Sequence, residues 1–313
     1  MTSDEPVALY PGLRGPVITS PQSKHLKEAA KLHKRSWRNK ARRFLMEGPQ
    51  TIREALRHQL ELAPAAVTIP TGRDKETGEP IFPKGAPRGS VVDLWITAEA
   101  AERHTDILGL AKQADVRIHQ ATKEALTEVS DTEHSQGLVG VAERLDVPLT
   151  DVVTKQSKLV IVLSQVRDPG NAGTVLRVAD AAGADGIVFT SASVDVYNPK
   201  TVRSTAGSLF HTPVVTGVGL PEVTELARAR GMQVLAADAH QPAHDLHVPW
   251  DTGLDLTRPT VWVFGNEAWG LPEADRAQCD AAVAIPIYGR AESLNLASAA
   301  SICIYESAKN VRL

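Results

Sequence analysis

Four stretches of the chain place glycines and polar side chains directly beside apolar runs that predict buried strands. In parallel α/β sheets, ligands bind beyond the carboxyl ends of the strands, so chemistry is expected in these stretches. Each one taken alone predicts only a glycine turn or a helix cap, and their joint occurrence points to a site. The stretches are Asp168–Gly183, Tyr197–Phe210, Val263–Pro272 and Ile285–Ala297.

The first two stretches carry cations suited to phosphate groups. Asn171 is expected to cap a helix, and Arg177 follows six residues later among Ala, Val and Leu. An arginine in such a helix is costly to bury unless it is paired with an anion, either a carboxylate of the fold or a phosphate. In the second stretch, Lys200, Arg203 and Ser204 cluster near a predicted helix start, where phosphate contacts are favourable.

The third and fourth stretches supply polar side chains of another kind. A predicted strand ends abruptly in Gly265, Asn266 and Glu267, and Ser293 and Asn295 come just before an Ala-rich helix. Carboxylate, hydroxyl and amide groups can orient a substrate by hydrogen bonds. These side chains are therefore candidates for the same site as the cations.

Other chemistries are not supported. The chain has no Gly-x4-Gly-Lys-Ser/Thr phosphate loop and no Gly-x-Ser-x-Gly nucleophile elbow. Asp238–His247 holds three histidines and two aspartates, but it is a Pro-containing loop without a defined face, so we expect no metal site. Cys279 and Cys303 are too few for a disulfide framework or a zinc site and are expected to be small core residues.

The second half of the chain predicts an α/β fold. Helical patterns lie between most of its apolar runs, which indicates a mostly parallel sheet with helices on both faces. The predicted strands are Leu159–Ser164, Gly186–Phe189, Val214–Thr216, Gln233–Ala236, Thr260–Phe264 and Ala282–Ile285. The predicted helices are Gly173–Ala182, Val202–Leu209, Pro221–Arg230, Pro272–Gln278 and Leu294–Ala308.

The first half predicts a smaller α/β domain, preceded by a mobile tail over residues 1–20. A helix is expected to start at Pro21 with Ser20 as its cap, residues 71–90 to form a surface insertion, and residues 148–155 to form a linker. The predicted strands are Phe44–Glu47, Ala66–Ile69, Val91–Ile96, Val116–His119 and Leu138–Ala142. The other predicted helices are Gln50–Leu60, Glu99–Gln113 and Lys123–Val129.

Composition and charge narrow the class of protein. The 313 residues are 42% hydrophobic and 23% charged, as in a protein able to bury a core. No apolar run approaches the ~18 residues of a membrane helix and no secretory signal is recognisable, so we expect a cytoplasmic protein with no membrane partner. The net charge of −3 hides a basic segment, residues 24–43, with nine Lys or Arg and one Glu. Such a segment indicates an anionic partner or a solvated helix face.

Together, the stretches resemble the SpoU/TrmH family of RNA ribose 2′-O-methyltransferases, of the SPOUT class. The resemblance covers residues 158–313 and rests on Asn-x-Gly-x3-Arg at 171–177, Gly-Asn-Glu-x-x-Gly-Leu at 265–271 and Ile-Pro…Glu-Ser-Leu-Asn at 285–295. Residues 21–150 resemble the L30e-like RNA-binding domain that often precedes the methyltransferase domain, through Leu45–Leu56 and Gln136–Gly140. The resemblance implies an α/β SPOUT domain with a deep trefoil knot behind a small L30e-like domain.

The resemblance implies S-adenosylmethionine as the cofactor, held largely by backbone groups at Gly265, Ile285 and Leu294. It implies methyl transfer to a ribose 2′-hydroxyl, with Arg177 at the position of the family's essential arginine. Since arginine remains protonated in proteins, we expect Arg177 to hold an RNA phosphate and stabilise the developing alkoxide, while a proton-accepting role stays open. The residues expected to position the ribose and this arginine are Asn171, Glu267, Ser293 and Asn295.

The implied partners are structured RNA and a second copy of the chain, because family members are homodimers with sites built across the dimer. Ribosomal RNA is favoured over transfer RNA because an L30e-like domain suits a folded RNA loop. The alternatives are a transfer-RNA methyltransferase and a non-catalytic RNA-binding protein, although the intact catalytic motifs argue against the latter. Trp269 departs from the family pattern and is either a base-stacking surface or dimer core. The expected RNA contacts are Lys34, Arg35, Arg38, Lys200 and Arg203.

Overall fold

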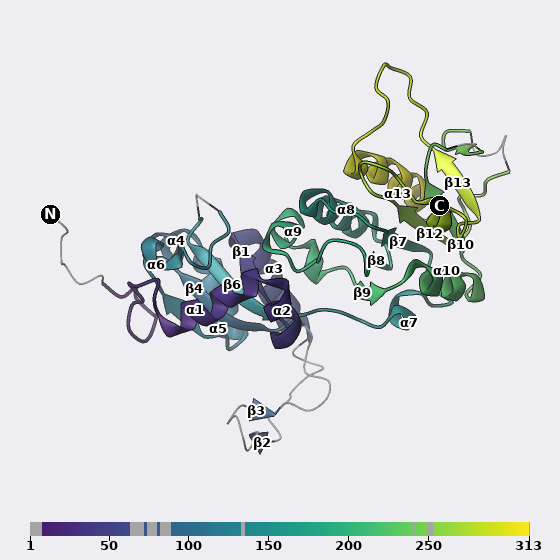
Figure 1. Cartoon of the computed structure of the whole chain (residues 1–313). Coiled ribbons are helices and arrows are strands. Elements are labelled where there is room, and N and C mark those ends of the chain that lie inside the picture. The colour runs from purple at the N-terminus through teal and green to yellow at the C-terminus, as the bar shows by residue number, and fades with distance from the viewer. Residues whose placement is uncertain are drawn as a thin grey trace. The chain divides into compact units, whose positions relative to one another are not determined.

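The computed structural model describes residues 8–62, 72–73, 80–81, 89–132, 135–240, 242–248 and 253–312. The chain forms two compact units (Figure 1). Unit 1 is Met1–Leu145 with Tyr197–Pro199, and unit 2 is Asp146–Val196 with Lys200–Leu313. The strand predicted over Ala66–Ile69 and most of the insertion predicted over 71–90 lie outside the described residues. Of that insertion, the structure gives β2 (Gly72–Arg73) paired antiparallel with β3 (Pro80–Ile81).

Unit 1 is built on a four-stranded sheet in the order β1-β6-β4-β5. β6 pairs antiparallel with β1 and β4, and β4 pairs parallel with β5. A buried cluster that includes Leu26, Leu45 and Trp95 joins the N-terminal helix to the sheet. The strands are β1 (Arg43–Glu47), β4 (Val91–Ile96), β5 (Ile118–Gln120) and β6 (Leu138–Glu143). The helices are α1 (Lys24–Ala30), η1 (Lys31–His33), α2 (Arg35–Ala41), α3 (Pro49–Leu62), α4 (Ala98–Arg103), α5 (Thr105–Gln113) and α6 (Lys123–Leu126).

Two helices of unit 1 differ from the sequence prediction. The first begins at Lys24 with Ser23 in its cap position, so a start at Pro21 is wrong. The helical region is interrupted at Lys34, whose φ of −90° and ψ of 128° are extended. The helix predicted over Glu99–Gln113 is split at His104, where φ is −125° and ψ is 52°. Both breaks preserve the spacing of apolar residues, which is why the periodicity did not reveal them.

The sheet of unit 2 has seven parallel strands in the order β11-β13-β10-β12-β7-β8-β9. All residues of β7, β8 and β12 are buried, as expected for strands covered on both faces. The order places β10 between β12 and β13, so the carboxyl ends of these three strands are adjacent. The strands are β7 (Leu159–Leu163), β8 (Gly186–Thr190), β9 (Val214–Val218), β10 (Gln233–Ala237), β11 (His244–Asp245), β12 (Thr260–Phe264) and β13 (Ala281–Ala284).

The helices of unit 2 correct three predictions. The cap of α8 is Asp168, not Asn171, because the Asp168 side chain accepts the backbone N–H of Asn171. The helix predicted over Val202–Leu209 is replaced by α9 and η3, separated at Gly207, whose φ is +100°. The linker predicted over 148–155 contains α7. The helices are α7 (Leu149–Val152), α8 (Pro169–Ala182), α9 (Pro199–Ser204), η3 (Ser208–Phe210), α10 (Leu220–Ala229), α12 (Glu273–Arg276) and α13 (Leu296–Arg312).

The C-terminal helix α13 packs against α8 and β12. Trp262 of β12 donates its indole N–H to Oγ of Ser307 over 2.8 Å. Figure 1 shows the segment between β13 and α13 as a long loop that leaves the sheet and returns to α13.

Cys303 is buried and Cys279 half-buried, and burial raises the pKa of each thiol to about 12. No helix in the described ranges is long and apolar enough to span a membrane. The predicted α/β class with a parallel sheet is confirmed, and the knot stays a prediction.

Candidate active site

Side chains from three separate stretches of unit 2 are joined by hydrogen bonds. Nδ2 of Asn171 donates to Oε1 of Glu267 over 3.2 Å, and Nδ2 of Asn295 donates to Oδ1 of Asn171 over 3.1 Å. The three residues lie in the first turn of α8, after β12 and just before α13. The structure thus brings together three residues that the sequence analysis assigned to one site, and their roles stay predictions.

Neighbouring hydrogen bonds fix the direction of this network. Oδ1 of Asn295 accepts the backbone N–H of Ala297 over 2.9 Å, which leaves Nδ2 of Asn295 to donate. Asn171 is held by Oδ1 of Asp168, which accepts its backbone N–H over 2.7 Å. Because the amide of Asn171 both accepts and donates, the network runs from Asn295 to the carboxylate of Glu267.

The turn that carries Glu267 is held by its own backbone and by the buried side chain of Asn266. Asn266 and Gly270 exchange two backbone hydrogen bonds of 2.9 Å. Nδ2 of Asn266 donates to the carbonyl oxygen of Gln165, and its Oδ1 accepts the N–H of Ala268, each over 2.9 Å. A Cβ at Gly265 would lie 2.4 Å from the carbonyl carbon of Gly270, so the protein's own turn requires glycine there. Asn266 was expected only as a polar side chain after the strand, and the structure shows that it braces this turn.

Gly173 lets α9 approach α8 closely. A Cβ at this position would lie 2.6 Å from Cβ of Ser204 and 2.6 Å from the carbonyl oxygen of Thr201, closer than packed atoms come. α9 carries Lys200, which is exposed, and Arg203, which is half-buried. The glycine of the first motif thus brings both of these cations beside α8.

Arg177 lies in the middle of α8 and is exposed. No hydrogen bond or ion pair within the described part of the chain engages its guanidinium group. Of the two anions considered for Arg177, a carboxylate among the described residues does not pair with it, and a phosphate stays a prediction. Its charge is available to an anion that comes from outside.

The loop between β13 and α13 carries the remaining predicted residues and lies largely at the surface. Ile285 is half-buried, Leu294 is 37% exposed and Ser293 is exposed. No hydrogen bond among the described residues joins Ser293 to Asn171, Glu267 or Asn295. The structure places Ser293 in the same loop as Asn295 without bringing it into the network.

An aromatic ring and a cation face each other beside the same turn. The Trp269 side chain is 48% exposed, and the guanidinium carbon of Arg167 lies 5.2 Å from its ring centroid. Arg167 precedes α8 and was not predicted, since nothing in its spacing from Trp269 signals the contact. An exposed ring flanked by arginine is a surface on which a nucleic-acid base can stack.

Comparisons with known proteins identify the family. Residues 158–305 match the model of the SpoU rRNA methylase family, and residues 23–140 match that of an MRM3-like substrate-binding domain. A 23S rRNA guanosine 2′-O-methyltransferase from Bacillus subtilis is 30% identical over 92% of this chain and 97% of its own length. The chain belongs to the SpoU rRNA methylase family.

Solved structures agree with this assignment. An rRNA methyltransferase from Sinorhizobium meliloti with bound AdoMet matches at a TM-score of 0.72 and 26% identity, covering 93% of this chain and 97% of that one. The SpoU methyltransferase AviRb from Streptomyces viridochromogenes, in complex with AdoMet, matches at a TM-score of 0.68 and 27% identity, covering 92% and 98%. The SpoU family membership predicted from three motifs is confirmed.

Unit 1 of this SpoU protein exposes two of its three predicted RNA contacts. Lys34 and Arg35 are exposed. Arg38 is 2% exposed, and its Nη1 donates to the carbonyl oxygens of Leu32 and His33 over 2.8 and 2.7 Å. Arg38 therefore braces the break between η1 and α2, which argues against the predicted contact with RNA.

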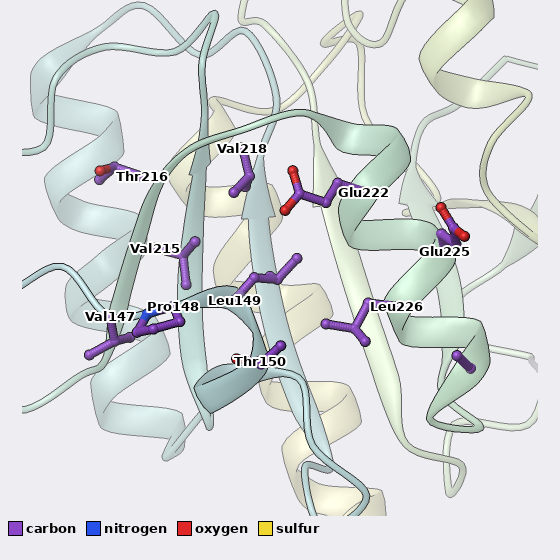
Figure 2. A pocket seen from close by; sticks show the side chains of 11 residues that line it. Val147, Pro148, Leu149, Thr150, Val215, Thr216, Val218, Glu222, Glu225 and Leu226 are labelled. Atoms are coloured by element: carbon purple, nitrogen blue, oxygen red, sulfur yellow. The ribbon is translucent and has the colours of Figure 1, made fainter.

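A groove of about 600 Å³ in unit 2 involves none of the SpoU motif residues (Figure 2). It is lined by α7, β9 and α10, with Leu149, Val215 and Leu226 among its apolar side chains. Glu222 and Glu225 of α10 also line it, and their charge would repel an RNA backbone. We assign this groove no part in the site.

The described residues include no group of three His, Cys, Asp or Glu that could hold a metal ion.

Proposed function

We propose that this protein transfers a methyl group from S-adenosylmethionine to a ribose 2′-hydroxyl in ribosomal RNA. The observation that carries the proposal is the hydrogen-bonded chain from Asn295 through Asn171 to Glu267, in which three SpoU motifs meet. The 23S rRNA 2′-O-methyltransferase named above, which is similar over nearly the whole chain, supports ribosomal RNA as the substrate class.

The residues present fit the cofactor. Ile285 and Leu294 are partly exposed apolar side chains able to wall an adenine ring, and we assign the contacts to Gly265, Ile285 and Leu294. At the same end of the sheet, Oδ2 of Asp238 is buried without a hydrogen-bond donor among the described residues, as expected where a ligand supplies the donor. When bound, S-adenosylmethionine supplies an electrophilic methyl group on a positively charged sulfur.

The chain's own side chains bind and orient the RNA. Arg177 holds a phosphate next to the target ribose and stabilises the negative charge that develops on the 2′-oxygen. Asn295 lies nearest the hydroxyl, and Asn171 and Glu267 hold its amide in a fixed direction. We assign Ser293, which lies in the same loop as Asn295, to the same set of positioning residues.

RNA recognition is assigned to residues 21–150, and methyl transfer to residues 158–313. The exposed cations of the basic segment, with Lys34 and Arg35 among them, add electrostatic attraction for RNA. Lys200 and Arg203, which lie beside α8, add to this electrostatic attraction for RNA. We place the reaction in the cytoplasm, where bacterial ribosomal RNA is made.

A second copy of the chain completes the site. Ile302 and Tyr305 of α13 are 37% and 51% exposed, which leaves apolar surface on the helix that packs against α8. We propose that this surface forms the homodimer interface, so that Arg177 meets RNA held partly by the partner copy. Replacing Ile302 with Glu should give monomers in light scattering, and a dimer that persists would refute this interface.

Methyl transfer is tested with radiolabelled S-adenosylmethionine and total bacterial RNA, separated into ribosomal and transfer fractions. Label in ribosomal RNA that survives alkali as a 2′-O-methylated dinucleotide supports the proposal. Label in transfer RNA would instead show that the substrate is transfer RNA and that the protein is a transfer-RNA methyltransferase. No label in either fraction, with cofactor binding established, would favour a non-catalytic RNA-binding protein.

A further inference from the structure

Asp238 occupies a position in the sheet that the motifs of the family do not mark. It follows β10 directly, and its backbone N–H donates to the carbonyl oxygen of Val283 in β13 over 3.1 Å. β10 lies between β12, which ends just before Gly265, and β13, which ends just before Ile285. Asp238 therefore stands between the two loops to which the proposed function assigns the cofactor.

The Asp238 carboxylate is buried and only half satisfied. Its side chain is 2% exposed, and Oδ1 accepts the backbone N–H of His240 over 2.8 Å and also contacts Nδ1 of that ring. Oδ2 has no hydrogen-bond partner among the described residues. A Cβ built on Gly270 would lie 3.9 Å from this oxygen, so Oδ2 lies beside the turn that carries Glu267. A buried carboxylate oxygen without a donor is unfavourable unless a ligand supplies one.

The negative charge of Asp238 already has a positively charged neighbour in Arg276, which limits the kind of ligand group that could donate a hydrogen bond to Oδ2. Nη1 of Arg276 lies 3.7 Å from Oδ2, within ion-pair distance but with no hydrogen bond formed. A second full cation at Oδ2 would meet the guanidinium group of Arg276. A neutral donor such as a hydroxyl group supplies the hydrogen bond without that repulsion.

We propose that Oδ2 of Asp238 accepts a hydrogen bond from a ribose hydroxyl of bound S-adenosylmethionine. This inference rests on the proposed function and adds a positioning residue to it. On one side of Asp238, the loop after β13 carries Ile285 and Leu294, which would wall the adenine. On the other side, the turn after β12 carries Glu267, which the proposed function assigns to the reacting end of the cofactor. The ribose is the part of the cofactor that connects these two ends, and β10 lies between the two strands.

The test is a double-mutant cycle on equilibrium binding, which needs no methyl transfer. S-adenosylhomocysteine and its 2′,3′-dideoxy analogue are titrated by calorimetry into the full-length wild-type protein and into Asp238→Asn. The variant keeps an oxygen for the His240 N–H and replaces the open acceptor with an amide donor. The wild type should bind the hydroxylated ligand at least about tenfold more tightly than the analogue, and the variant should lose most of that preference.

Asp255→Asn is the matched control. Asp255 is an exposed aspartate of unit 2, and its carboxylate accepts hydrogen bonds from Thr257. Its backbone carbonyl oxygen accepts a hydrogen bond from Gln233, the first residue of β10, so Asp255 lies at the end of β10 opposite to Asp238. This control should keep the wild-type preference for the hydroxylated ligand. An equal preference in wild type and Asp238→Asn overturns the inference and makes Asp238 a brace of the His240 turn. A wild-type protein that binds neither ligand refutes the proposed function itself.

Discussion

Asn295 donates its side-chain amide to Asn171 across 124 residues of sequence, over 3.1 Å. The same side chain also begins α13, because its Oδ1 accepts the N–H of Ala297. One residue therefore starts the last helix and holds the first turn of α8. The two tasks use different atoms of one amide, so they can be separated by substitution.

Asn295→Asp should impair methyl transfer while leaving the fold intact. The aspartate retains an oxygen to cap α13 but cannot donate to Oδ1 of Asn171, and its charge repels that oxygen. We expect kcat to fall at least about tenfold, with a melting temperature close to that of the wild type. Asn295→Ala is the comparison variant, since it also removes the cap and should cost about 1 kcal/mol of stability. Wild-type kcat in Asn295→Asp would show that the network does not orient the reaction.

Arg177→Ala should abolish methyl transfer and leave the affinity for S-adenosylhomocysteine within a few-fold of the wild type. The affinity is expected to persist because the guanidinium group is exposed, and its removal breaks no hydrogen bond or ion pair among the described residues. Single-turnover transfer and calorimetric binding measure the two effects separately. Arg177→Lys keeps the charge but loses the two-pronged geometry and should recover only part of the rate. A fully active alanine variant would refute the role of Arg177.

Gly173→Ala should destabilise the protein, because the added Cβ would meet Ser204 and the carbonyl oxygen of Thr201 at 2.6 Å. Overpacking of this kind costs about 1–3 kcal/mol, which denaturant unfolding can measure. The control is Gly109→Ala in α5, another glycine inside a helix, where a Cβ would meet nothing within 4 Å. The control should be stabilised by about 0.5–1 kcal/mol, the usual gain from replacing glycine in a helix. Equal effects at both sites would mean that α9 shifts freely away from α8.

The contrast between these glycines shows what the sequence can reveal about the site. The motif residues were predicted because they follow buried strands. The positions of these strands can be predicted from continuous runs of apolar residues such as Leu159–Leu163. The sequence did not show why a particular residue type is required at a particular position. Gly265 was expected to contact the cofactor, and Gly173 entered only as a motif residue. The structure gives each a packing reason: a Cβ at Gly173 would meet Thr201 and Ser204 of α9, and a Cβ at Gly265 would meet the backbone of Gly270.

Errors in the sequence analysis arose where local hydrogen bonds or packing decide the outcome. Asp168 and Asn171 are both good capping residues, and only the structure shows that Asp168 caps α8. Arg38 belongs to a segment rich in cations, but its guanidinium group turns inward to two carbonyl oxygens. Periodicity carries no information on such contacts, since they depend on where the chain turns.

Removing two exposed charges from the basic segment should weaken RNA binding and reduce its dependence on salt. In the double variant Lys34→Gln/Arg35→Gln, fewer phosphates are neutralised, so the slope of log K against log salt should become shallower by about 1–2. The measurement is a filter-binding titration of ribosomal RNA at several salt concentrations. Lys112→Gln is the matched control, an exposed lysine of α5 in the same unit but outside residues 24–43, and should keep the wild-type slope. An unchanged slope in the double variant, with the control also unchanged, would mean that the basic segment is a solvated face and that RNA is held elsewhere.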